Sequence, residues 1–391
     1  MTDIIIAGIG QTTVGEHWDV GLRDLAYQAM HAAIQDAGGL KPQALFVGNM
    51  LAPNLSKQAH LGALLADYAG LRFDYAQHSA GIEAVTIEAA GASGGAALRQ
   101  GYLAVKSGLV DTALVVGVEK FTDQVGAGVE EALATAADSD FESVQGLTQS
   151  AQAALIMKRY VHEYDVPADG FAGFALTAHA NGAGNPNAMF QKAIKPETYA
   201  RAGESPNMFD AAPLADGAAA LVLTRRDLLP SNWPHPLVKI AGSATASDTL
   251  ALHDRKDMLF FEAAHLSAGR AMKQAGVTLD QVNLFEYHDA FSIYAALTLE
   301  SIGFAIRGQG WKLAADGHIA LNGHIPCATM GGLKARGFPG GGAGVYQAVE
   351  AAQQLRGEFD ANQIPDAKYA LVQSLGGPAS TAVTHILQKI D

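Results

Sequence analysis

The run IIIAG at residues 4–8 returns as VKIAG at residues 238–242, and this repeat decides the fold. Both runs are short, apolar and rich in β-branched residues, which indicates a buried strand. An Ala-rich amphipathic stretch follows each run and ends in Ala-Gly, at 37–38 and at 275–276, where glycine suits the left-handed end of a helix. The chain is therefore predicted to contain one strand–helix unit twice.

Further along the chain, the two copies contain matching segments in the same order. Matching segments are predicted strands at 44–47 and 283–287, Gly-rich turns that open helices at 91–98 and 340–346, and later strands at 113–117 and 370–373. Strands alternating with helices predict an α/β fold with mostly parallel sheets covered by helices. We expect two pseudo-symmetric halves related by an axis that places Ala7 on Ala241 and Ala37 on Ala275.

The length and the composition fit this organisation. The chain has 391 residues, of which 49% are apolar and 17% are charged, so it is long enough for more than one domain with an ample core. We expect an N-terminal half at 1–235, which includes a long excursion over a cleft at about 121–235. The C-terminal half is expected at 236–391.

Charge and cysteine content exclude several classes of function. The formal net charge is −13, which would repel nucleic acid and anionic membrane surfaces. The single cysteine, Cys327, excludes an intrachain disulfide framework and a Cys-rich metal site, and we expect it to be a small buried hydrophobe. The start has no basic region, and no stretch approaches 18 apolar residues. We expect a cytoplasmic protein with no metal and no inserted membrane segment.

Several motifs carry a family resemblance, and they occur in the family's order over nearly the whole chain. They are IEAAGASGGAAL at 87–98, VVGVEKFTD at 115–123, HDAF at 288–291, GGLKARGFP at 331–339 and the Gly pair at 376–377. With these motifs the chain resembles the thiolases. HDAF and GGLKARG are most similar to the archaeal and sterol-carrier-protein-type branch of that family.

The resemblance implies a thiolase-like duplicated α/β/α layered fold, in agreement with the repeat. It also implies the acyl-CoA chemistry of lipid metabolism, with a coenzyme A thioester as substrate or ligand and no permanently bound cofactor. Thiolases form homodimers, and members of this branch often work with a small OB-fold zinc-ribbon protein. The resemblance therefore implies a homodimer and a possible small partner.

Three catalytic positions of the family hold other residues in this chain. Gly91 stands where the family has its nucleophilic cysteine, Phe338 replaces the histidine of the GHP motif, and Ser374 matches the second cysteine. Glycine cannot carry an acyl group and phenylalanine cannot take a proton, so ordinary ping-pong thiolysis is not expected. Ser93 is a conceivable substitute nucleophile, but a helix N-cap is the favoured interpretation.

The electrostatic part of the family's site is retained. The resemblance assigns one oxyanion hole to the backbone N–H groups of Gly91 and Gly376, which need no side chain. It places His288 in the other oxyanion hole, where an imidazole either polarises a carbonyl or transfers a proton. Asp289 is expected to cap a helix or to orient His288, and capping is the favoured interpretation.

Tyr294 and Tyr346 are further candidate catalytic residues. A thiolase-like subgroup cleaves steroid acyl-CoA side chains by a retro-aldol reaction, lacks the nucleophilic cysteine and uses tyrosines instead. This chain resembles that subgroup because it lacks the same cysteine. Packing in the core with a hydrogen-bonded hydroxyl is the alternative for both tyrosines.

Four basic side chains have weaker signals. Lys334 and Arg336 lie beside glycines, and they are expected either to face a CoA phosphate or to be solvated at the surface. His78 and His179 are polar candidates for which we expect positions in solvent-facing loops.

Three functions are compatible with these residues. The favoured one is a lyase or aldolase that breaks or forms the C–C bond β to the thioester of a 3-hydroxyacyl-CoA through an enolate, without an acyl-enzyme. The second is thiolase-type acyl transfer with an unrecognised nucleophile or direct attack by CoA. The third is a non-catalytic subunit that binds acyl-CoA or scaffolds an active thiolase.

Overall fold

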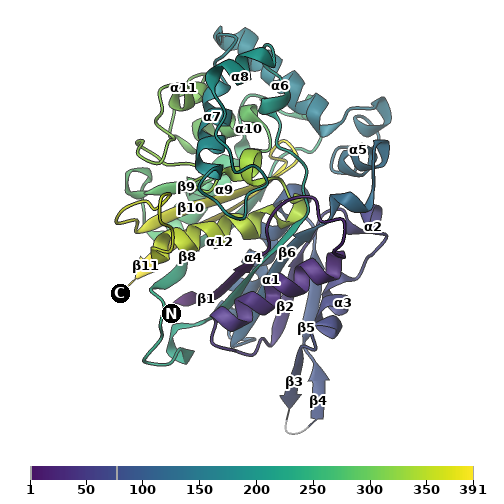
Figure 1. Cartoon of the computed structure of the whole chain (residues 1–391), viewed down its shortest axis with the longest axis vertical. Coiled ribbons are helices and arrows are strands. Elements are labelled where there is room, and N and C mark those ends of the chain that lie inside the picture. The colour runs from purple at the N-terminus through teal and green to yellow at the C-terminus, as the bar shows by residue number, and fades with distance from the viewer. Residues whose placement is uncertain (1, 76–77, 391) are drawn as a thin grey trace.

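The centre of the molecule is one nine-stranded sheet with helices packed against it (Figure 1). The computed structural model describes residues 2–75 and 78–390, without the side chains of residues 72–80. The strand order is β5-β2-β6-β7-β1-β8-β11-β10-β9, and a separate hairpin is formed by β3 (Arg72–Tyr75) and β4 (His78–Gly81). The strands of the large sheet are β1 (Ile4–Gln11), β2 (Ala44–Gly48), β5 (Glu83–Ile87), β6 (Thr112–Glu119), β7 (Gly217–Arg225), β8 (Leu237–Ser247), β9 (Leu284–Glu286), β10 (Tyr369–Gly376) and β11 (Thr381–Ile390).

Helices connect these strands. The α-helices are α1 (Leu22–Asp36), α2 (Ala52–Leu55), α3 (Leu61–Tyr68), α4 (Ser93–Ser107), α5 (Ala127–Ala134), α6 (Gln149–Tyr164), α7 (Ala172–Gly182), α8 (Pro196–Arg201), α9 (Glu262–Ala275), α10 (Ser292–Ile302), α11 (Gly310–Ala315) and α12 (Ala343–Arg356). Three short helical turns bear on the site, namely η1 (Ala90–Ala92), η8 (Gly332–Arg336) and η9 (Gly340–Gly342).

The structure confirms that the chain repeats one order of elements. The series β1, α1, β2, α4, β6, β7 in the first half returns as β8, α9, β9, α12, β10, β11 in the second. From the middle of the sheet outward, the strands run β1, β7, β6, β2 on one side and β8, β11, β10, β9 on the other. The two copies meet where β1 lies antiparallel to β8, with Ile5 opposite Lys239. A boundary at residue 235 stays a prediction.

Ala7 and Ala241 have the same irregularity in the two copies. The pairing of β1 with β7 shifts between Ile6 and Gly8, so that Ala7 has no partner. The pairing of β8 with β11 shifts in the same way and leaves Ala241 without a partner. Such a β-bulge bends the strand and increases its twist. The shared bulge agrees with the expected superposition of these two alanines.

Gly8 and Gly242 are points of very close approach between a strand and a helix. A Cβ built at Gly8 would lie 2.1 Å from the carbonyl oxygen of Ala33 in α1, and one at Gly242 would lie 2.1 Å from that of Ala271 in α9.

We expect Gly242→Ala to lower the free energy of unfolding by about 1–3 kcal/mol, because the added methyl group overpacks this contact. Urea denaturation measures the change. Gly269→Ala, at an open position of α9, is the control and should instead stabilise by about 0.5–1 kcal/mol; similar losses in both variants would contradict the interpretation.

The expectation of mostly parallel sheets is wrong. Only β2–β5, β2–β6 and β9–β10 are parallel among the described strands, whereas β1–β7, β1–β8, β6–β7, β8–β11 and β10–β11 are antiparallel. The physical reason is visible at β10 and β11, which a short turn joins directly. Such a connection forces neighbouring strands to run in opposite directions.

The helices form layers with the two halves of the sheet. Helix α1 packs on β1, β6 and β7, and α9 packs on β8, β10 and β11, whereas α4 and α12 both contact strands of both halves. Helices α4 and α12 touch at glycines, since a Cβ at Gly344 would lie 2.4 Å from the backbone nitrogen of Gly95. The turns η1 and η9, which precede these two central helices, are also in contact. The central layer therefore brings two N-terminal turns together.

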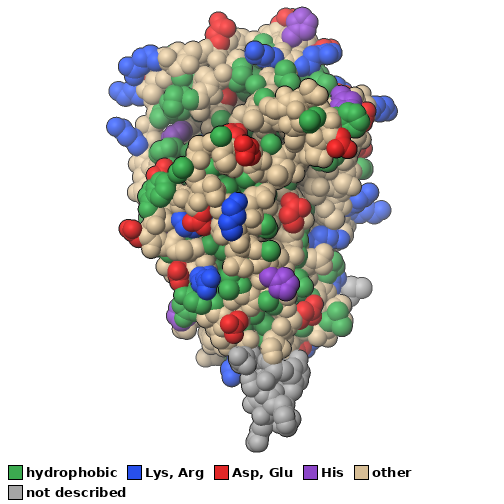
Figure 2. Space-filling view, turned by 90° about the vertical axis from the view of Figure 1, so that its right-hand side faces the viewer, with side chains coloured by type: hydrophobic (Ala, Val, Ile, Leu, Met, Phe, Trp, Pro, Cys, Tyr) green, Lys and Arg blue, Asp and Glu red, His purple; other side chains and the backbone are tan. Residues whose placement is uncertain are grey.

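A long excursion separates β6 from β7. It contains α5, α6, α7 and α8, and Figure 1 shows α6, α7 and α8 at the top of the molecule together with α10 and α11. Contacts of α10 with α6 and of α11 with α7 join the excursion to the second half. Figure 2 shows acidic, basic and apolar side chains interspersed over one face. No helix in the described part of the chain is long and apolar enough to cross a membrane.

Candidate active site

Four chain segments meet beside the start of α4. Gly91 lies in η1, His288 follows β9 by two residues, Phe338 lies between η8 and η9, and Gly376 ends β10. A Cβ built at Gly91 would lie 3.1 Å from Cε1 of His288, and the rings of His288 and Phe338 meet edge to face with centroids 5.4 Å apart. A Cβ built at Gly376 would lie 2.6 Å from the carbonyl oxygen of Ala89. The structure thus brings these predicted residues together.

Position 91 has no space for a side chain. A Cβ at Gly91 would lie 2.7 Å from the carbonyl oxygen of Leu375, besides its contact with the His288 ring. A separation below 3.0 Å from a backbone atom requires the chain to move. The preceding residue, Ala90, has a positive φ of 49°, a conformation that costs energy outside glycine. Position 91 is therefore closed to a side chain and carries no thiol.

His288 is held as a neutral imidazole. Its side chain is 2% exposed, and burial, reinforced by the positive charge of Arg336, lowers the pKa of His288 to about 3. Its Nδ1 has no hydrogen-bond partner among the described residues, and its Nε2 lies 3.4 Å from the Cβ position of Gly91. A neutral imidazole offers one N–H donor and one acceptor. This ring is suited to donating a hydrogen bond and holds an added proton poorly.

Asp289 is not the N-cap of a helix, because Phe291 occupies that position in α10 and Gly331 in η8, but its carboxylate binds the backbone of η8. Its Oδ1 accepts a hydrogen bond from the backbone N–H of Leu333 at 2.7 Å, and the residue is fully buried. Gly332 lies so close that a Cβ there would be 2.6 Å from Oδ2 of Asp289. The carboxylate therefore ties the HDAF motif to the η8 turn, which precedes Phe338.

Ser93 holds the backbone of η1. Its Oγ accepts from the N–H of Ala89 at 2.9 Å and donates to the carbonyl of Ala90 at 2.6 Å. The expected N-cap position is wrong by one residue, because Ala92 is the N-cap of α4 and Ser93 is its first residue. With its hydroxyl engaged in two hydrogen bonds and fully buried, Ser93 is poorly placed to act as a nucleophile.

A buried ion pair near His288 was not predicted from the sequence. Nη1 of Arg336 lies 2.5 Å from Oε2 of Glu350, and the two side chains are 0% and 1% exposed. The guanidinium carbon of Arg336 also lies 5.1 Å from the centre of the Tyr346 ring. Burial raises the pKa of Glu350, and the charge of Arg336 opposes that rise. The solvated alternative for Arg336 is wrong, because this pair takes the guanidinium into the core.

The two candidate tyrosines lie in different surroundings. The hydroxyl of Tyr346 is 3.0 Å from Oγ1 of Thr12 and donates to the Thr12 carbonyl at 3.1 Å, so it is engaged in the core. The hydroxyl of Tyr294 has no partner among the described residues, and its ring lies 5.0 Å from that of Phe291 in HDAF. Ser374 is fully buried and donates to a glutamine of α12. Of these three residues, only Tyr294 has a free hydroxyl beside the HDAF motif.

The other sequence candidates are mostly buried. Lys334 is 2% exposed, so the solvated alternative is wrong for it as well. His179 is 7% exposed inside α7, which corrects the expected solvent-facing loop. The side chain of His78 lies outside the described residues. Cys327 is a buried free thiol that donates to the carbonyl of Ile325, as expected for a small buried residue.

A cavity of about 230 Å³ adjoins the HDAF motif. Its walls come from Phe291 and Ile293, from α6 including Met157, and from the segment 206–211. The lining is mostly apolar, as is usual for sites of organic ligands. In the described part of the chain, no three His, Cys, Asp or Glu side chains are grouped so that they could hold a metal ion.

Comparisons with known proteins identify the family of the chain. Family models match twice, as the N-terminal domain of thiolase over residues 4–211 and as a thiolase C-terminal domain-like region over residues 244–389. An acetyl-CoA acetyltransferase of Methanothermobacter thermautotrophicus is 38% identical over 100% of both chains. Sterol carrier protein 2 of Bos taurus is 27% identical over 92% of this chain and 67% of its own.

A solved structure titled Ltp2-ChsH2(DUF35) aldolase has the same fold. It superposes with a TM-score of 0.83 at 24% identity, over 99% of this chain and 98% of that one. The sequence motifs, the duplicated layers and the two family matches lead to one conclusion. The chain belongs to the thiolase superfamily, in its archaeal and sterol-carrier-protein-like branch.

Proposed function

We propose that this protein is a Cys-independent lyase or aldolase that acts on a 3-hydroxyacyl-CoA through a thioester enolate. The observation that carries the proposal is the closed backbone at Gly91, which excludes a covalent nucleophile there, beside a neutral buried imidazole at His288. An enolate mechanism needs donors for the developing oxyanion and needs no acyl-enzyme.

The proposed reaction leaves the protein without a covalent intermediate. The C2–C3 bond of the 3-hydroxyacyl-CoA breaks, and its electron pair enters the thioester enolate while the hydroxyl oxygen becomes a carbonyl oxygen. The hydroxyl proton passes to solvent, and the enolate takes a proton at C2. The N–H of His288 would donate to the enolate oxygen, together with the backbone N–H groups of Gly91 and Gly376, and Tyr294 is the candidate for a second polar contact. Tyr346 has no part in the proposal, because Thr12 engages its hydroxyl.

Thiolase-type acyl transfer is the second candidate function. It is favoured by the name of the 38% identical relative, acetyl-CoA acetyltransferase. Intact-protein mass spectrometry after incubation with acetyl-CoA separates the two candidates. The lyase proposal expects no acetyl adduct, and an adduct that CoA then removes would support acyl transfer.

Gly91→Cys is expected not to restore acetoacetyl-CoA thiolysis. The added side chain meets Leu375 and the ring of His288. Because the pKa of His288 is lowered to about 3, this imidazole is a weak base, and the thiol keeps a pKa too high for efficient attack. Release of acetyl-CoA from acetoacetyl-CoA and CoA measures the activity. Gly91→Ala is the matched control for crowding alone. Thiolysis by Gly91→Cys but not by Gly91→Ala, with Phe338 unchanged, would contradict the proposed site.

We also propose a homodimer and a small protein partner. The aldolase with the same fold is titled as a pair with ChsH2(DUF35), and this supports a search for a partner of similar kind. Light scattering on the purified chain at micromolar concentration tests the dimer. A monomer under those conditions would count against it.

A further inference from the structure

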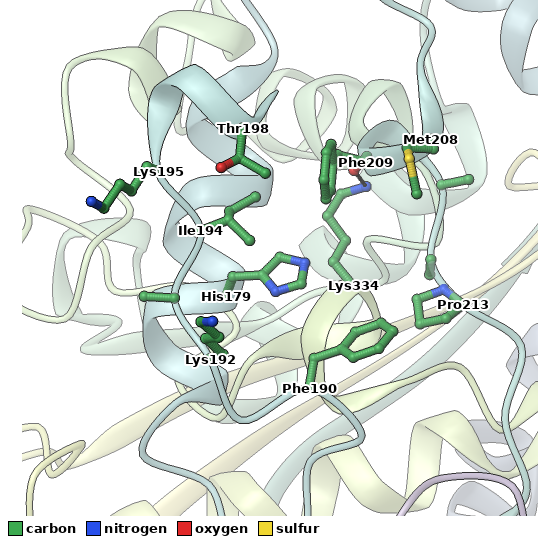
Figure 3. A pocket seen from close by; sticks show the side chains of 13 residues that line it. His179, Phe190, Lys192, Ile194, Lys195, Thr198, Met208, Phe209, Pro213 and Lys334 are labelled. Atoms are coloured by element: carbon green, nitrogen blue, oxygen red, sulfur yellow. Dashed lines mark hydrogen bonds between the residues drawn. The ribbon is translucent and has the colours of Figure 1, made fainter. Parts of the chain in front are cut away.

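A cavity of about 640 Å³ lies between the excursion and Lys334 of the η8 turn, and none of Gly91, His288, Phe338 and Gly376 lines it. Its walls are formed by α7, the segment 190–195, α8 and the segment 208–213 (Figure 3). The walls are mostly aromatic and aliphatic, and no acidic side chain lines them. A volume of this size suits an organic group as large as one or two rings.

Lys334 is a buried ammonium group in the wall of this cavity that forms no direct ion pair among the described residues, although the charges of Asp210 and Asp289 act on it from a greater distance. It is 2% exposed and donates to the carbonyls of Phe209 at 3.2 Å and Asp210 at 2.8 Å. No carboxylate of the described residues lies within ion-pair distance of it, and one of its three N–H groups remains for a ligand. A buried charge is costly unless it is paired. This ammonium therefore favours an anion in the cavity.

His179 is a second polar group in the wall. Its side chain is 7% exposed, and its Nδ1 has no partner among the described residues. Its ring stacks on Phe190, with centroids 5.7 Å apart, and meets Phe209 edge to face. Figure 3 shows the His179 ring beside the carbon stem of Lys334, whose amino end lies next to Phe209. The cavity thus combines apolar walls with the ammonium of Lys334 and the imidazole ring of His179.

One wall of the cavity is hydrogen-bonded to the candidate active site. The N–H of Ala212 donates to the carbonyl of Ala290 at 2.8 Å, and the N–H of Phe338 donates to the carbonyl of Pro213 at 2.9 Å. Ala211 lines both this cavity and the smaller one beside HDAF. A ligand here would lie next to the residues that surround His288.

We propose that this cavity binds the distal end of the acyl group, and that the substrate class is an acyl-CoA whose apolar acyl group carries a carboxylate. Lys334 donates to the carboxylate, and the exposed Lys192 and Lys195 at the rim add positive charge. The inference rests on the proposed function. The phosphates of CoA are the other possible source of an anion, but the apolar walls favour an acyl group over a nucleotide.

Calorimetric titration of the wild-type protein with 4-phenylbutyrate and its neutral amide tests the proposal. The carboxylate should bind at least tenfold more tightly than the amide. Lys334→Met should remove that preference while the amide still binds, and Lys273→Met, an exposed lysine on α9, should leave it unchanged. Should Lys334→Met not fold, Thr198→Phe, which narrows the cavity from α8, must weaken both compounds at least tenfold.

Three outcomes would overturn the inference. They are equal binding of carboxylate and amide, a preference retained in Lys334→Met, and displacement of 4-phenylbutyrate by adenosine 3′,5′-bisphosphate, which would assign the cations to the nucleotide of CoA. Failure here is distinguishable from failure of the lyase proposal. Cleavage of a 3-hydroxyacyl-CoA without a distal carboxylate does not need this site, and the binding of the free acid does not need catalysis.

Discussion

Replacing His288 by alanine is expected to lower the turnover of a 3-hydroxyacyl-CoA about a hundredfold, which corresponds to the loss of one oxyanion donor, about 3 kcal/mol. The substitution removes the imidazole that the structure places against Gly91. Steady-state kinetics measures the change. His253→Ala, at an exposed histidine, is the matched control and should leave turnover unchanged.

His288→Gln separates the two roles considered for the imidazole. Burial lowers the pKa of His288 to about 3, so the ring stays neutral from pH 5 to 8 and should act as a donor. Gln, which also donates, should therefore retain more turnover than Ala, and the wild-type pH profile should show no step from His288 near pH 6.5. Equal losses in Gln and Ala would favour proton transfer. Unchanged turnover in both variants would exclude His288 from the chemistry.

Glu350→Leu is expected to lower the free energy of unfolding by about 3–5 kcal/mol, because it leaves the guanidinium of Arg336 buried without its partner. Urea denaturation followed by circular dichroism measures the loss. The double variant Arg336→Met/Glu350→Leu should recover most of it, since no charge then remains unpaired. Glu131→Leu, at an exposed position of α5, should change stability by no more than about 0.5 kcal/mol.

The double variant also gives the result that would contradict this account. If it is as unstable as Glu350→Leu alone, the loss comes from the shape of the glutamate side chain and not from an unpaired charge. Arg336 also lies near His288 and helps to keep the pKa of that imidazole low. The ion pair therefore anchors the end of the η8 turn, which carries Lys334 and precedes Phe338.

Much of the fold could be predicted from the repeat of IIIAG and VKIAG. Each copy has a bulged alanine followed by a glycine that touches the next helix. The bulge and the close contact require the same Ala-Gly pair in both copies, and this pair can be recognised in the sequence. The sequence contains no comparable signal for the direction of a strand. A buried apolar run such as β7 looks the same whether it lies parallel or antiparallel to its neighbour, so the mixed sheet could not be predicted.

The candidate site was predicted where motifs lie in short contiguous runs. Gly91, His288, Phe338 and Gly376 each belong to such a run, and the structure brings them together. The pairing of Arg336 with Glu350 left no signal, because it joins a turn to a helix with no periodic pattern. Lys334 belongs to the GGLKARG run, but its burial could not be predicted, because alternating cations in a Gly-rich segment are also typical of a solvated surface.

Product analysis of a 3-hydroxyacyl-CoA incubated with the protein tests the central claim most directly. Chromatography with mass spectrometry should detect a free carbonyl compound and a shortened acyl-CoA in equal amounts, formed without added CoA and without a covalent acyl adduct on the protein. If the hydroxyacyl-CoA is left intact while acetoacetyl-CoA and CoA are converted to acetyl-CoA through such an adduct, the enolate account is wrong.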